Sequence, residues 1–503
     1  MEAFPVALVR QAQESAASMV RPGKLLDCAV AGITSICWGA IGRLPRTRRP
    51  TRLVALAGSG MNGADALLVT ARLRSRGLEC MAVLVKDSAY GPGLAAARDA
   101  GVTVIDATTP EGLSAAPGAL GGADVILDGI VGLGGVAGLR GAAKELVRSI
   151  SARALVIALD LPSGVDPDSG ETPGPHIRAD LTIAIGALAP CLLLPPATRA
   201  AGNVLYLDNG FRPHLHARPV VARLSRADAG TLWPGPTHDD HKYTRGTLGV
   251  VAGSATYPGA ALLACSGAVL SGAGVVRYSG PSEVRRMLVG RRPEVVPGLG
   301  RPTAHLLGSG IADDAVQRQS VLDALSSGTP CLVDAEALDL CVERRAAGRR
   351  EVDASRMLLT PHTGELARLF TMLGDPVTAQ EVRARPWHYA NELANRTDTT
   401  VLLKGSTTIV ASPGGRGFSQ ADGPPWLATA GSGDVLAGIA GALLASGMDA
   451  ATAGALAAQV HGLAAHLSCP DGPAPAGRVA DALPRAVATL IRRAGSTIGR
   501  DLL

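Results

Sequence analysis

Short apolar runs recur along the whole chain, and each one ends in a cluster of glycine and polar residues. Segments with helical periodicity separate these runs. Uninterrupted apolar strands between helices are typical of parallel sheets that are buried on both faces. The sequence therefore predicts an α/β protein whose ligands bind outside the carboxyl ends of its strands. The predicted strands include 53–57, 80–85, 102–105, 125–127, 155–159, 181–185, 306–307, 331–333, 357–359 and 401–403.

The length of the chain predicts more than one domain. Its 503 residues exceed what a single core usually holds, and a hydrophobic content of 47% is enough to fill two cores. Residues 211–236 are rich in Pro, His and Arg and show little periodicity, which is typical of a connection between domains. We therefore predict a first domain over 1–215, a linker over 216–236 and a second domain over 237–503.

Composition argues against several classes of protein. Aromatic residues make up 3% of the chain and the net charge is +5, which disfavours a nucleic-acid binder that stacks bases. Charged residues near the N-terminus argue against a signal peptide, and glycine and prolines break the long uncharged run at 181–198, so we expect no membrane span. The eight cysteines lack CxxC spacing, which indicates reduced thiols in a cytoplasmic protein. Helices rich in Ala and Gly would suit self-association.

Three glycine-rich polar loops follow predicted strands of the first domain, at 58–65, 128–135 and 160–166. Because the carboxyl ends of parallel strands meet at one edge of a sheet, we expect the loops to form one crevice. Asn62, Asp128 and Ser163 in these loops offer hard oxygen atoms that suit a monovalent or divalent cation. The alternative is that these side chains only stabilise turns. The first loop meets neither the dinucleotide-binding nor the Walker pattern.

These three loops together resemble NAD(P)H-hydrate epimerase. The resemblance implies a Rossmann-like three-layer α/β/α sandwich, a potassium ion held by Asn62, Asp128 and Ser163, and a catalytic Asp160. Three positions depart from the family pattern: Met61 replaces the usual Asn, Ala64 replaces the usual Gly, and Ala189 stands where Lys is common. The residues that the resemblance places against the hydrated nucleotide are Met61, Asn62, Gly63, Ala64, Asp65, Gly132, Leu133, Gly134, Gly135, Val136, Ala137, Gly138 and Asp160.

A glycine-rich turn at 430–434 runs into the uncharged segment 435–448, which predicts a buried helix. The free N–H groups of such a helix N-terminus bind anions, phosphate above all. A carboxylate beside a phosphate is repelled unless it takes a proton from a hydroxyl that meets that phosphate. We therefore interpret Asp434 as a general base next to an anion hole. The alternative is an aspartate that only interacts favourably with the helix dipole.

The second domain resembles the ribokinase-like ADP/ATP-dependent NAD(P)H-hydrate dehydratase, through motifs at 257–260, 360–365, 403–406 and 430–438. Thr360, Pro361 and Glu365 also resemble a helix cap. The resemblance implies that magnesium enters with ADP or ATP, and the likeness to bacterial members favours ADP. The implied hydrate contacts are Ala260, Gly310, His362 and Asp434, and the implied nucleotide contacts are Lys404, Gly405, Ser406, Thr407, Thr408 and Gly433.

Together, the two resemblances imply a bifunctional enzyme that repairs hydrated nicotinamide nucleotides. The first domain would act as an isomerase that interconverts the R and S epimers of NAD(P)H hydrate. The second would act as a lyase that dehydrates the S form at the expense of ADP or ATP. One alternative is a ribokinase-like kinase of a small molecule, which would release a stable phosphorylated product. Another is that the first domain only binds ligands, because Met61, Ala64 and Ala189 depart from the family pattern.

Overall fold

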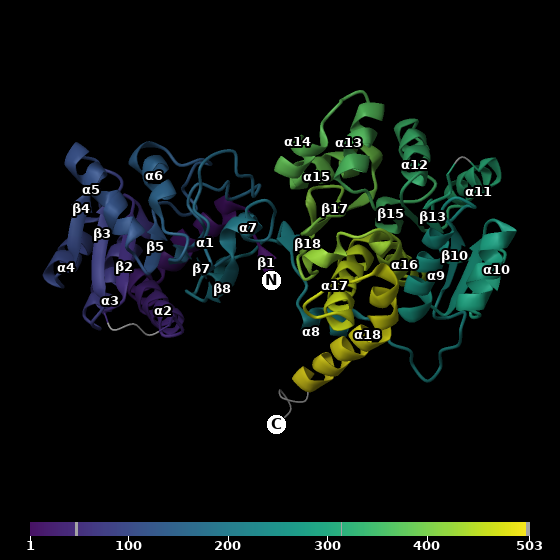
Figure 1. The fold of residues 1–503 in the computed structure, drawn as a ribbon, viewed down its shortest axis with the longest axis horizontal. Helices are drawn as coiled ribbons and strands as arrows, with labels where there is room; N and C mark the ends of the chain where they lie inside the picture. Colours follow the sequence, from purple (N-terminus) through teal and green to yellow (C-terminus); the bar gives the residue numbers. More distant parts are fainter. Residues whose placement is uncertain (46–48, 313, 499–503) are drawn as a thin grey trace. The chain divides into compact units, whose positions relative to one another are not determined.

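The computed structural model describes residues 1–45, 49–312 and 314–498. The chain divides into two compact units, an N-terminal unit over Glu2–Val221 and a C-terminal unit from Ala222 onward (Figure 1). The predicted linker at 216–236 is not irregular throughout, because it contains strand β9 (Val221–Ala222) and helix α8 (Arg226–Leu232). A capping box between Ser225 and Asp228 starts α8, and Leu224, Ala229 and Trp233 join the core of the C-terminal unit. This helix is too short to show clear periodicity.

The N-terminal unit is built on a parallel sheet of seven strands. Side chains along β2 alternate between the two faces of the sheet: Leu53 and Ala55 enter one core, and Val54 and Leu56 enter the other. Both faces are therefore buried, as the apolar runs predict. In spatial order the strands are β4 (Thr103–Asp106), β3 (Glu79–Leu84), β2 (Arg52–Ala57), β5 (Val125–Gly129), β6 (Leu155–Leu159), β7 (Leu181–Ile185) and β8 (Asn203–Leu207).

Helices cover both faces of this sheet and confirm the expected three-layer sandwich (Figure 1). One face carries α2 (Lys24–Ile41), α3 (Met61–Arg74) and α4 (Gly91–Asp99), and the other carries α5 (Pro110–Gly121) and α6 (Gly141–Leu146). Helix α1 (Val6–Ser18) and helix α7 (Thr198–Ala201) complete the unit.

Helix α2 is the one helix in the described ranges that is long and apolar enough to cross a membrane. In the structure its apolar stripe lies in the core of the N-terminal unit, where Ala29, Val30, Ile33 and Cys37 are buried against the sheet and its neighbouring helix.

The sheet of the C-terminal unit has seven parallel strands, extended at one side by the antiparallel strands β17 and β18. Strand order in this unit is β18 (Arg416–Gln420), β17 (Thr408–Ser412), β16 (Thr400–Leu403), β15 (Met357–Leu359), β14 (Cys331–Val333), β13 (Ala304–Leu307), β10 (Thr247–Val251), β11 (Val275–Ser279), with the short β12 (Val296–Pro297) joined in parallel to β11. Helices on both faces confirm a second α/β domain.

One face of the C-terminal sheet is covered by α8, α9 (Pro258–Leu270), α10 (Ser282–Arg291), α16 (Ser432–Ala445), α17 (Ala450–Ser468) and α18 (Ala476–Ile498). The other face is covered by α11 (Ala315–Ser326), α12 (Ala337–Ala346), α13 (Thr363–Met372), α14 (Ala379–Ala384) and α15 (Pro386–Thr397). The helix predicted over 435–448 is α16, which ends at Ala445 because Gly447 adopts a positive φ of 93°.

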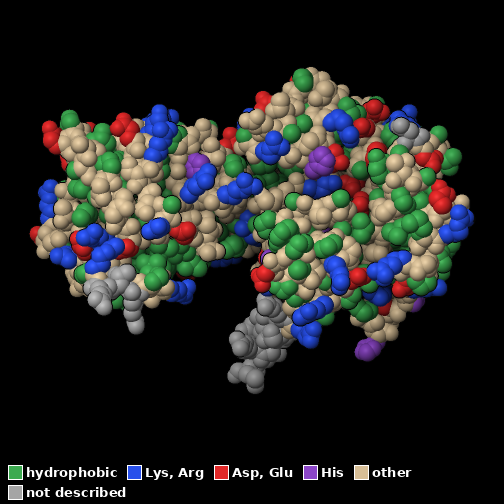
Figure 2. Space-filling view, in the orientation of Figure 1, with side chains coloured by type: hydrophobic (Ala, Val, Ile, Leu, Met, Phe, Trp, Pro, Cys, Tyr) green, Lys and Arg blue, Asp and Glu red, His purple; other side chains and the backbone are tan. Residues whose placement is uncertain are grey.

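Basic and acidic side chains are interspersed on the face of the molecule that Figure 2 shows. Such mixing is typical of a solvated surface.

Candidate active sites

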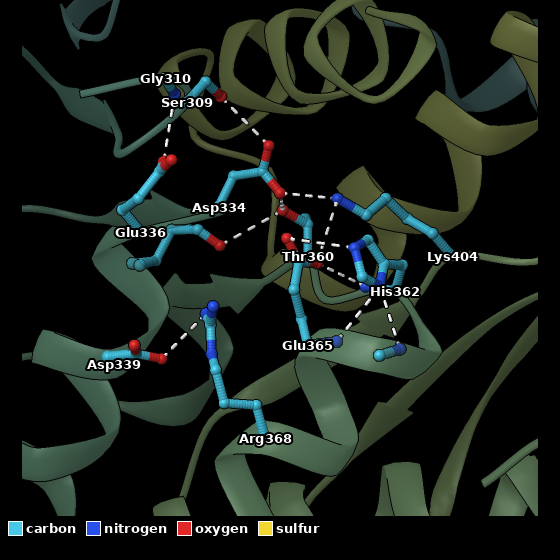
Figure 3. Close-up of polar contacts among 12 residues, drawn as sticks. Ser309, Gly310, Asp334, Glu336, Asp339, Thr360, His362, Glu365, Arg368 and Lys404 are labelled. Carbon is cyan, nitrogen blue, oxygen red and sulfur yellow. Dashed lines mark hydrogen bonds and ion pairs between the residues drawn. The ribbon is translucent and has the colours of Figure 1, made fainter. Parts of the chain in front are cut away.

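Polar side chains from four neighbouring strands of the C-terminal sheet converge at one edge (Figure 3). Ser309 follows β13, Asp334 follows β14, Thr360 follows β15, and Lys404 follows β16. These strands are parallel and adjacent, so the residues that follow them lie side by side. The helix N-terminus at Ser432 reaches the same edge, since a Cβ added to Gly433 would lie 3.6 Å from Lys404 Nζ.

Asp334 is the centre of this cluster. Its Oδ1 accepts hydrogen bonds from Thr360 Oγ1 and Lys404 Nζ, both at 2.8 Å, and its Oδ2 accepts one from Ser309 Oγ at 3.1 Å. Asp334 is 3% exposed, and three donors satisfy its carboxylate in this buried setting. Thr360, which the sequence suggests as part of a helix cap, instead bonds to Asp334, and that part of the cap prediction is wrong.

Lys404 brings a positive charge to the N-terminus of α16. Its Nζ lies 2.8 Å from Asp334 Oδ1 and 3.7 Å from Glu365 Oε2. Burial lowers the pKa of Lys404, but the charges of Asp334 and Glu365 outweigh burial and raise the pKa above its ordinary value. The ammonium therefore stays charged beside the free N–H groups of the helix, and together they form an anion-binding corner.

Asp434 lies in the first turn of α16 and shares this corner. Burial, together with the charge of Asp334, raises its pKa to about 7, although the charge of Lys404 and a hydrogen bond from Ser309 oppose the shift. A helix dipole alone would lower the pKa of an acid at this position. A carboxylate with a pKa near 7 is suited to accept a proton at neutral pH, so the site favours the general-base interpretation of Asp434.

His362 is the N-cap of α13. Its Nδ1 accepts hydrogen bonds from the backbone N–H groups of Gly364 at 3.0 Å and Glu365 at 3.1 Å, while Glu365 Oε2 accepts one from the His362 N–H at 2.7 Å. The side chain of His362 is 58% exposed beside the carboxylate cluster, and its Nε2 lies 3.6 Å from Glu365 Oε1. The turn before α13 therefore both caps the helix and faces the site.

The other residues predicted to bind the hydrate or the nucleotide lie around this cluster. A Cβ added to Gly310 would meet Ala260 Cβ at 2.8 Å, so these two residues are in contact. The Gly310 N–H donates to Glu336 Oε2 at 3.2 Å. In the turn from β16 into β17, Gly405 and Ser406 are exposed and Thr407 is buried, and Thr408, the first residue of β17, is half-buried.

In the N-terminal unit, the three predicted loops follow the adjacent strands β2, β5 and β6 and therefore meet at one edge. Asp128 Oδ1 accepts a hydrogen bond from Ser163 Oγ at 2.6 Å, and Asp128 Oδ2 accepts one from the Ser163 N–H at 2.8 Å. Asn62 donates to the Leu159 carbonyl at 2.8 Å. Its side chain also lies against Gly132, where an added Cβ would approach Asn62 Oδ1 to 2.6 Å.

Three aspartates are buried at this edge. Burial raises the pKa of Asp128 to about 6 and of Asp160 to about 6, and burial together with the charge of Asp160 raises the pKa of Asp65 to about 7. Asp65 Oδ1 has no hydrogen-bond partner among the described residues. Asp160 adopts a positive φ of 67°, and its Oδ2 accepts from the Leu133 N–H at 3.3 Å. Acids with raised pKa values around an unpaired oxygen indicate a binding or proton-transfer site.

The oxygen donors fit a monovalent cation. Asp128 is fully buried and hydrogen-bonded only to neutral donors, so a bound cation would balance its charge. Met61, Gly63, Ala64 and Asp65 form the first turn of α3. The loop 132–138 lies beside them, and its residue Val136 is 65% exposed. Ala189 is 2% exposed, so this position presents no side chain to solvent.

The sequence-based prediction missed several site residues. Asp334, Ser309, Glu336 and Glu365 stand in clusters that follow strands, but their type alone did not separate them from ordinary caps and turns. Arg10 gave no signal at all: its Nη2 donates to the Leu133 carbonyl at 2.9 Å and brings a cation from α1 to the loop 132–138. Within the described ranges, no group of three His, Cys, Asp or Glu side chains is arranged to hold a metal ion by itself.

Comparison with known proteins relates both units to known families. Residues 248–473 match the family model of NAD(P)H-hydrate dehydratase, and residues 24–191 match the model of the YjeF-related protein N-terminus. The bifunctional NAD(P)H-hydrate repair enzyme Nnr of Mycobacterium leprae is 37% identical over 93% of this chain and 94% of that protein. The Corynebacterium glutamicum enzyme of the same name is 30% identical over 96% of this chain and 98% of that protein.

Among solved structures, the ADP/ATP-dependent NAD(P)H-hydrate dehydratase from Bacillus subtilis, co-crystallised with ATP/Mg2+, is 30% identical, with a TM-score of 0.48. The match covers 54% of this chain and 99% of that chain. The likeness to the mycobacterial and corynebacterial relatives extends through both units. The chain therefore belongs to the family of bifunctional NAD(P)H-hydrate repair enzymes.

Proposed function

We propose that this protein restores NADH and NADPH from their hydrates, with an epimerase in the N-terminal unit and an ADP-dependent dehydratase in the C-terminal unit. The observation that carries the proposal is Asp434, a carboxylate with a pKa of about 7 at a helix N-terminus beside the charged Lys404. This pairing of a proton acceptor with an anion-binding corner supports transfer of a phosphoryl group to a hydroxyl.

In the dehydratase reaction, Asp434 takes the proton from the ring hydroxyl of the hydrate as that oxygen attacks the terminal phosphorus of ADP. The new O–P bond forms while the bond between phosphorus and the bridging oxygen breaks, and AMP leaves. The N–H groups at the start of α16 and the ammonium of Lys404 stabilise the negative charge on the transferring group. Phosphate then leaves the ring carbon, driven by the ring nitrogen, and loss of a proton from the neighbouring carbon restores the double bond.

Magnesium would enter with the nucleotide in this reaction. Glu336 and Glu365 lie at the rim of the cluster, and one or two such carboxylates with phosphate oxygens suit a magnesium ion. The ion would supply charge stabilisation for the phosphate groups. His362, Gly310 and Ala260 surround the same edge, and we assign them to binding of the hydrate.

In the epimerase reaction, we assign proton transfer to Asp160, whose pKa of about 6 places it within reach of neutral pH. Asn62, Asp128 and Ser163 would hold potassium, which supplies a positive charge near the nucleotide. The first turn of α3 and the loop 132–138 would bind the hydrated nucleotide. Epimerisation would let a dehydratase that acts on the S form clear both epimers.

The decisive experiment measures recovery of the absorbance of reduced nicotinamide from a mixture of both epimers, with magnesium, potassium and ADP. Full recovery supports both activities. Recovery of the S portion alone supports the dehydratase and contradicts the epimerase. A stable phosphorylated product without recovery of the reduced cofactor would instead support the small-molecule kinase.

The pH dependence of dehydration should report the protonation of Asp434. Because its pKa is raised to about 7 and a base must be unprotonated, we expect kcat/KM to rise with pH and to level off above that value. The charge of Asp334 raises this pKa, so Asp334→Asn should shift the rising limb to lower pH. Asp339→Asn is the matched control, since Asp339 pairs with Arg368 at 3.0 Å (Figure 3) and is not among the charges that shift the pKa of Asp434. Equal shifts in both variants would contradict the assignment.

Potassium should stabilise the N-terminal unit in a pH-dependent manner. Burial raises the folded-state pKa of Asp128 from 3.8 to about 6, so the stability that its protonated form contributes is lost as pH rises through that range. A bound cation offsets the buried charge, and a gain of about 1 kcal/mol raises the Tm of a unit this size by about 2–4 °C. We expect that increase in potassium chloride at about pH 8 and little of it at about pH 5.

Thermal unfolding in potassium chloride and in choline chloride at equal ionic strength measures this effect. Asp128→Asn should remove the difference between the two salts. An equal effect of choline would show that ionic strength, and not a potassium site, is responsible.

A further inference from the structure

Arg10 is a cation at the N-terminal site to which neither proposed reaction assigns a role. Its Nη2 donates to the Leu133 carbonyl at 2.9 Å, and the Leu133 N–H donates to Asp160 Oδ2 at 3.3 Å. The guanidinium and the carboxylate assigned to proton transfer are therefore bonded to the same residue. Arg10 is exposed, and it forms no other hydrogen bond and no ion pair with the described residues. Its remaining N–H groups are therefore open to a ligand.

The fold holds the helix that carries this arginine. The N–H of Val6, the first residue of α1, donates to Asp168 Oδ1 at 2.8 Å. Ala12 and Ala16 lie on the buried stripe of the same helix. Because its backbone is fixed and its side chain is hydrogen-bonded to the loop, the arginine is preorganised, which reduces the entropy lost when a ligand binds.

The loop 132–138 leaves room for a phosphate group beside this guanidinium. Four of its seven residues are glycine, so a ligand can come close to the backbone N–H groups. A Cβ added to Gly134 would lie 3.2 Å from Arg10 Nη2, so a side chain at this position would crowd the guanidinium.

The negative charge at this edge of the sheet makes a cation necessary for binding of a dinucleotide. Asp65, Asp128 and Asp160 are buried there, and a hydrated dinucleotide adds two negatively charged phosphate groups. Like charges that lie close together away from water repel strongly. The proposed potassium ion offsets the charge of Asp128, and Arg10 is the cation that contacts the loop 132–138.

We infer that Arg10 binds the pyrophosphate of the hydrated nucleotide at the loop 132–138, an inference that rests on the proposed epimerase function of this unit. The two N–H bonds of Nη2 lie on different edges of the planar guanidinium. The hydrogen bond to the Leu133 carbonyl therefore leaves one edge complete. A complete edge donates two parallel hydrogen bonds to two oxygens of a phosphate, which is the geometry for which arginine is suited.

Epimerisation without ADP tests this role in the full chain, because dehydration then does not occur. Chromatography follows one epimer of NADH hydrate as it approaches the R/S equilibrium. Arg10→Gln should raise KM about 10- to 100-fold, the usual cost of losing hydrogen bonds to a charged group, and should leave kcat nearly unchanged. Arg98→Gln is the matched control and should behave as the wild type. Arg98 is exposed near the end of α4, shortly before β4 begins, so it lies at the opposite edge of the sheet.

A substrate without phosphate separates phosphate binding from positioning of the loop. For the hydrate of reduced nicotinamide riboside, Arg10→Gln should leave kcat/KM unchanged. The hydrogen bond from Leu133 lowers the pKa of Asp160, so a displaced loop would shift the pH dependence of kcat to higher pH. Such a shift, or an equal loss of kcat/KM with both substrates, would show that Arg10 positions the loop and would overturn the inference.

Hydrogen exchange measured by mass spectrometry gives a readout that does not need turnover. NADH hydrate should protect peptides over 132–138 in the wild type and in Arg98→Gln, and much less in Arg10→Gln. Protection over 430–438 should persist in all three proteins. Protection of 132–138 that depends on Arg10 but comes without epimerisation would contradict the proposed reaction and still support phosphate binding. Equal exchange at 132–138 in Arg10→Gln and the wild type would overturn the inference, whether or not the protein epimerises the hydrate.

Discussion

Asp434→Asn is expected to lower the kcat of hydrate dehydration by about 10²- to 10⁴-fold, the usual contribution of a general base. The amide has nearly the shape of the carboxylate, so α16 and the anion-binding corner should persist. The hydrate and the nucleotide should therefore still bind, and the affinity of ADP should rise slightly because a negative charge near its phosphates is gone. Single-turnover kinetics and ligand binding by calorimetry separate the two effects.

The chain offers a matched control for this variant. Asp449 also stands at a helix N-terminus, where its Oδ1 accepts from the N–H groups of Ala451 at 3.1 Å and Thr452 at 3.0 Å. Asp449→Asn should leave kcat unchanged. If Asp434→Asn retained the wild-type turnover, or if both variants lost activity equally, Asp434 would not be the base.

Asp160→Asn is expected to abolish the recovery of the R epimer while recovery of the S epimer continues. Asp160 has a φ of 67°, a left-handed conformation that asparagine tolerates about as well as aspartate. The variant should therefore keep the loop intact and remove only the titratable group, with a loss of epimerisation of about 10²- to 10⁴-fold. The measurement follows both epimers by chromatography as the reduced cofactor forms.

Asp398→Asn is the control for this second variant. Asp398 is another aspartate with positive φ, at 50°, but it caps α15 in the C-terminal unit. This variant should epimerise the hydrate at the wild-type rate. Unchanged epimerisation in Asp160→Asn would move the proton transfer to another group, and Asp65 is the next candidate because its pKa is about 7 and its Oδ1 is unpaired among the described residues.

The three departures from the family pattern in the N-terminal unit differ in exposure. Met61 is 58% exposed at the start of α3, whereas Ala64 and Ala189 are buried. The aspartates and the Asp128–Ser163 hydrogen bonds are all retained. The loops therefore keep their buried aspartates, although Ala189 removes the charge of the usual Lys, and the aspartates favour an active epimerase over a unit that only binds ligands.

Much of this architecture follows from local sequence. Strands that are apolar on both faces are typical of a parallel sheet covered by helices. The glycine-rich cluster after each strand forms the turn that leads into the next helix. The conformation of the turn before α16 also follows from local sequence. Gly431 has a φ of 83°, which favours glycine, and a Cβ added there would approach Leu263 Cδ1 to 2.3 Å. Asp434 was therefore identifiable from its position after this turn.

Other features arise only when distant segments meet. Asp334, Thr360 and Lys404 come from three strands, and the pKa of Asp434 depends on the burial and charge that these elements create together. The same holds for Arg10, which meets the loop 132–138 through the Leu133 carbonyl. The sequence by itself determined the fold class and the loops at the strand ends, and it singled out Asp434 as the candidate base. Only the tertiary structure decided which charges face one another, because Coulomb interactions and desolvation depend on distances through space and not on separation along the chain.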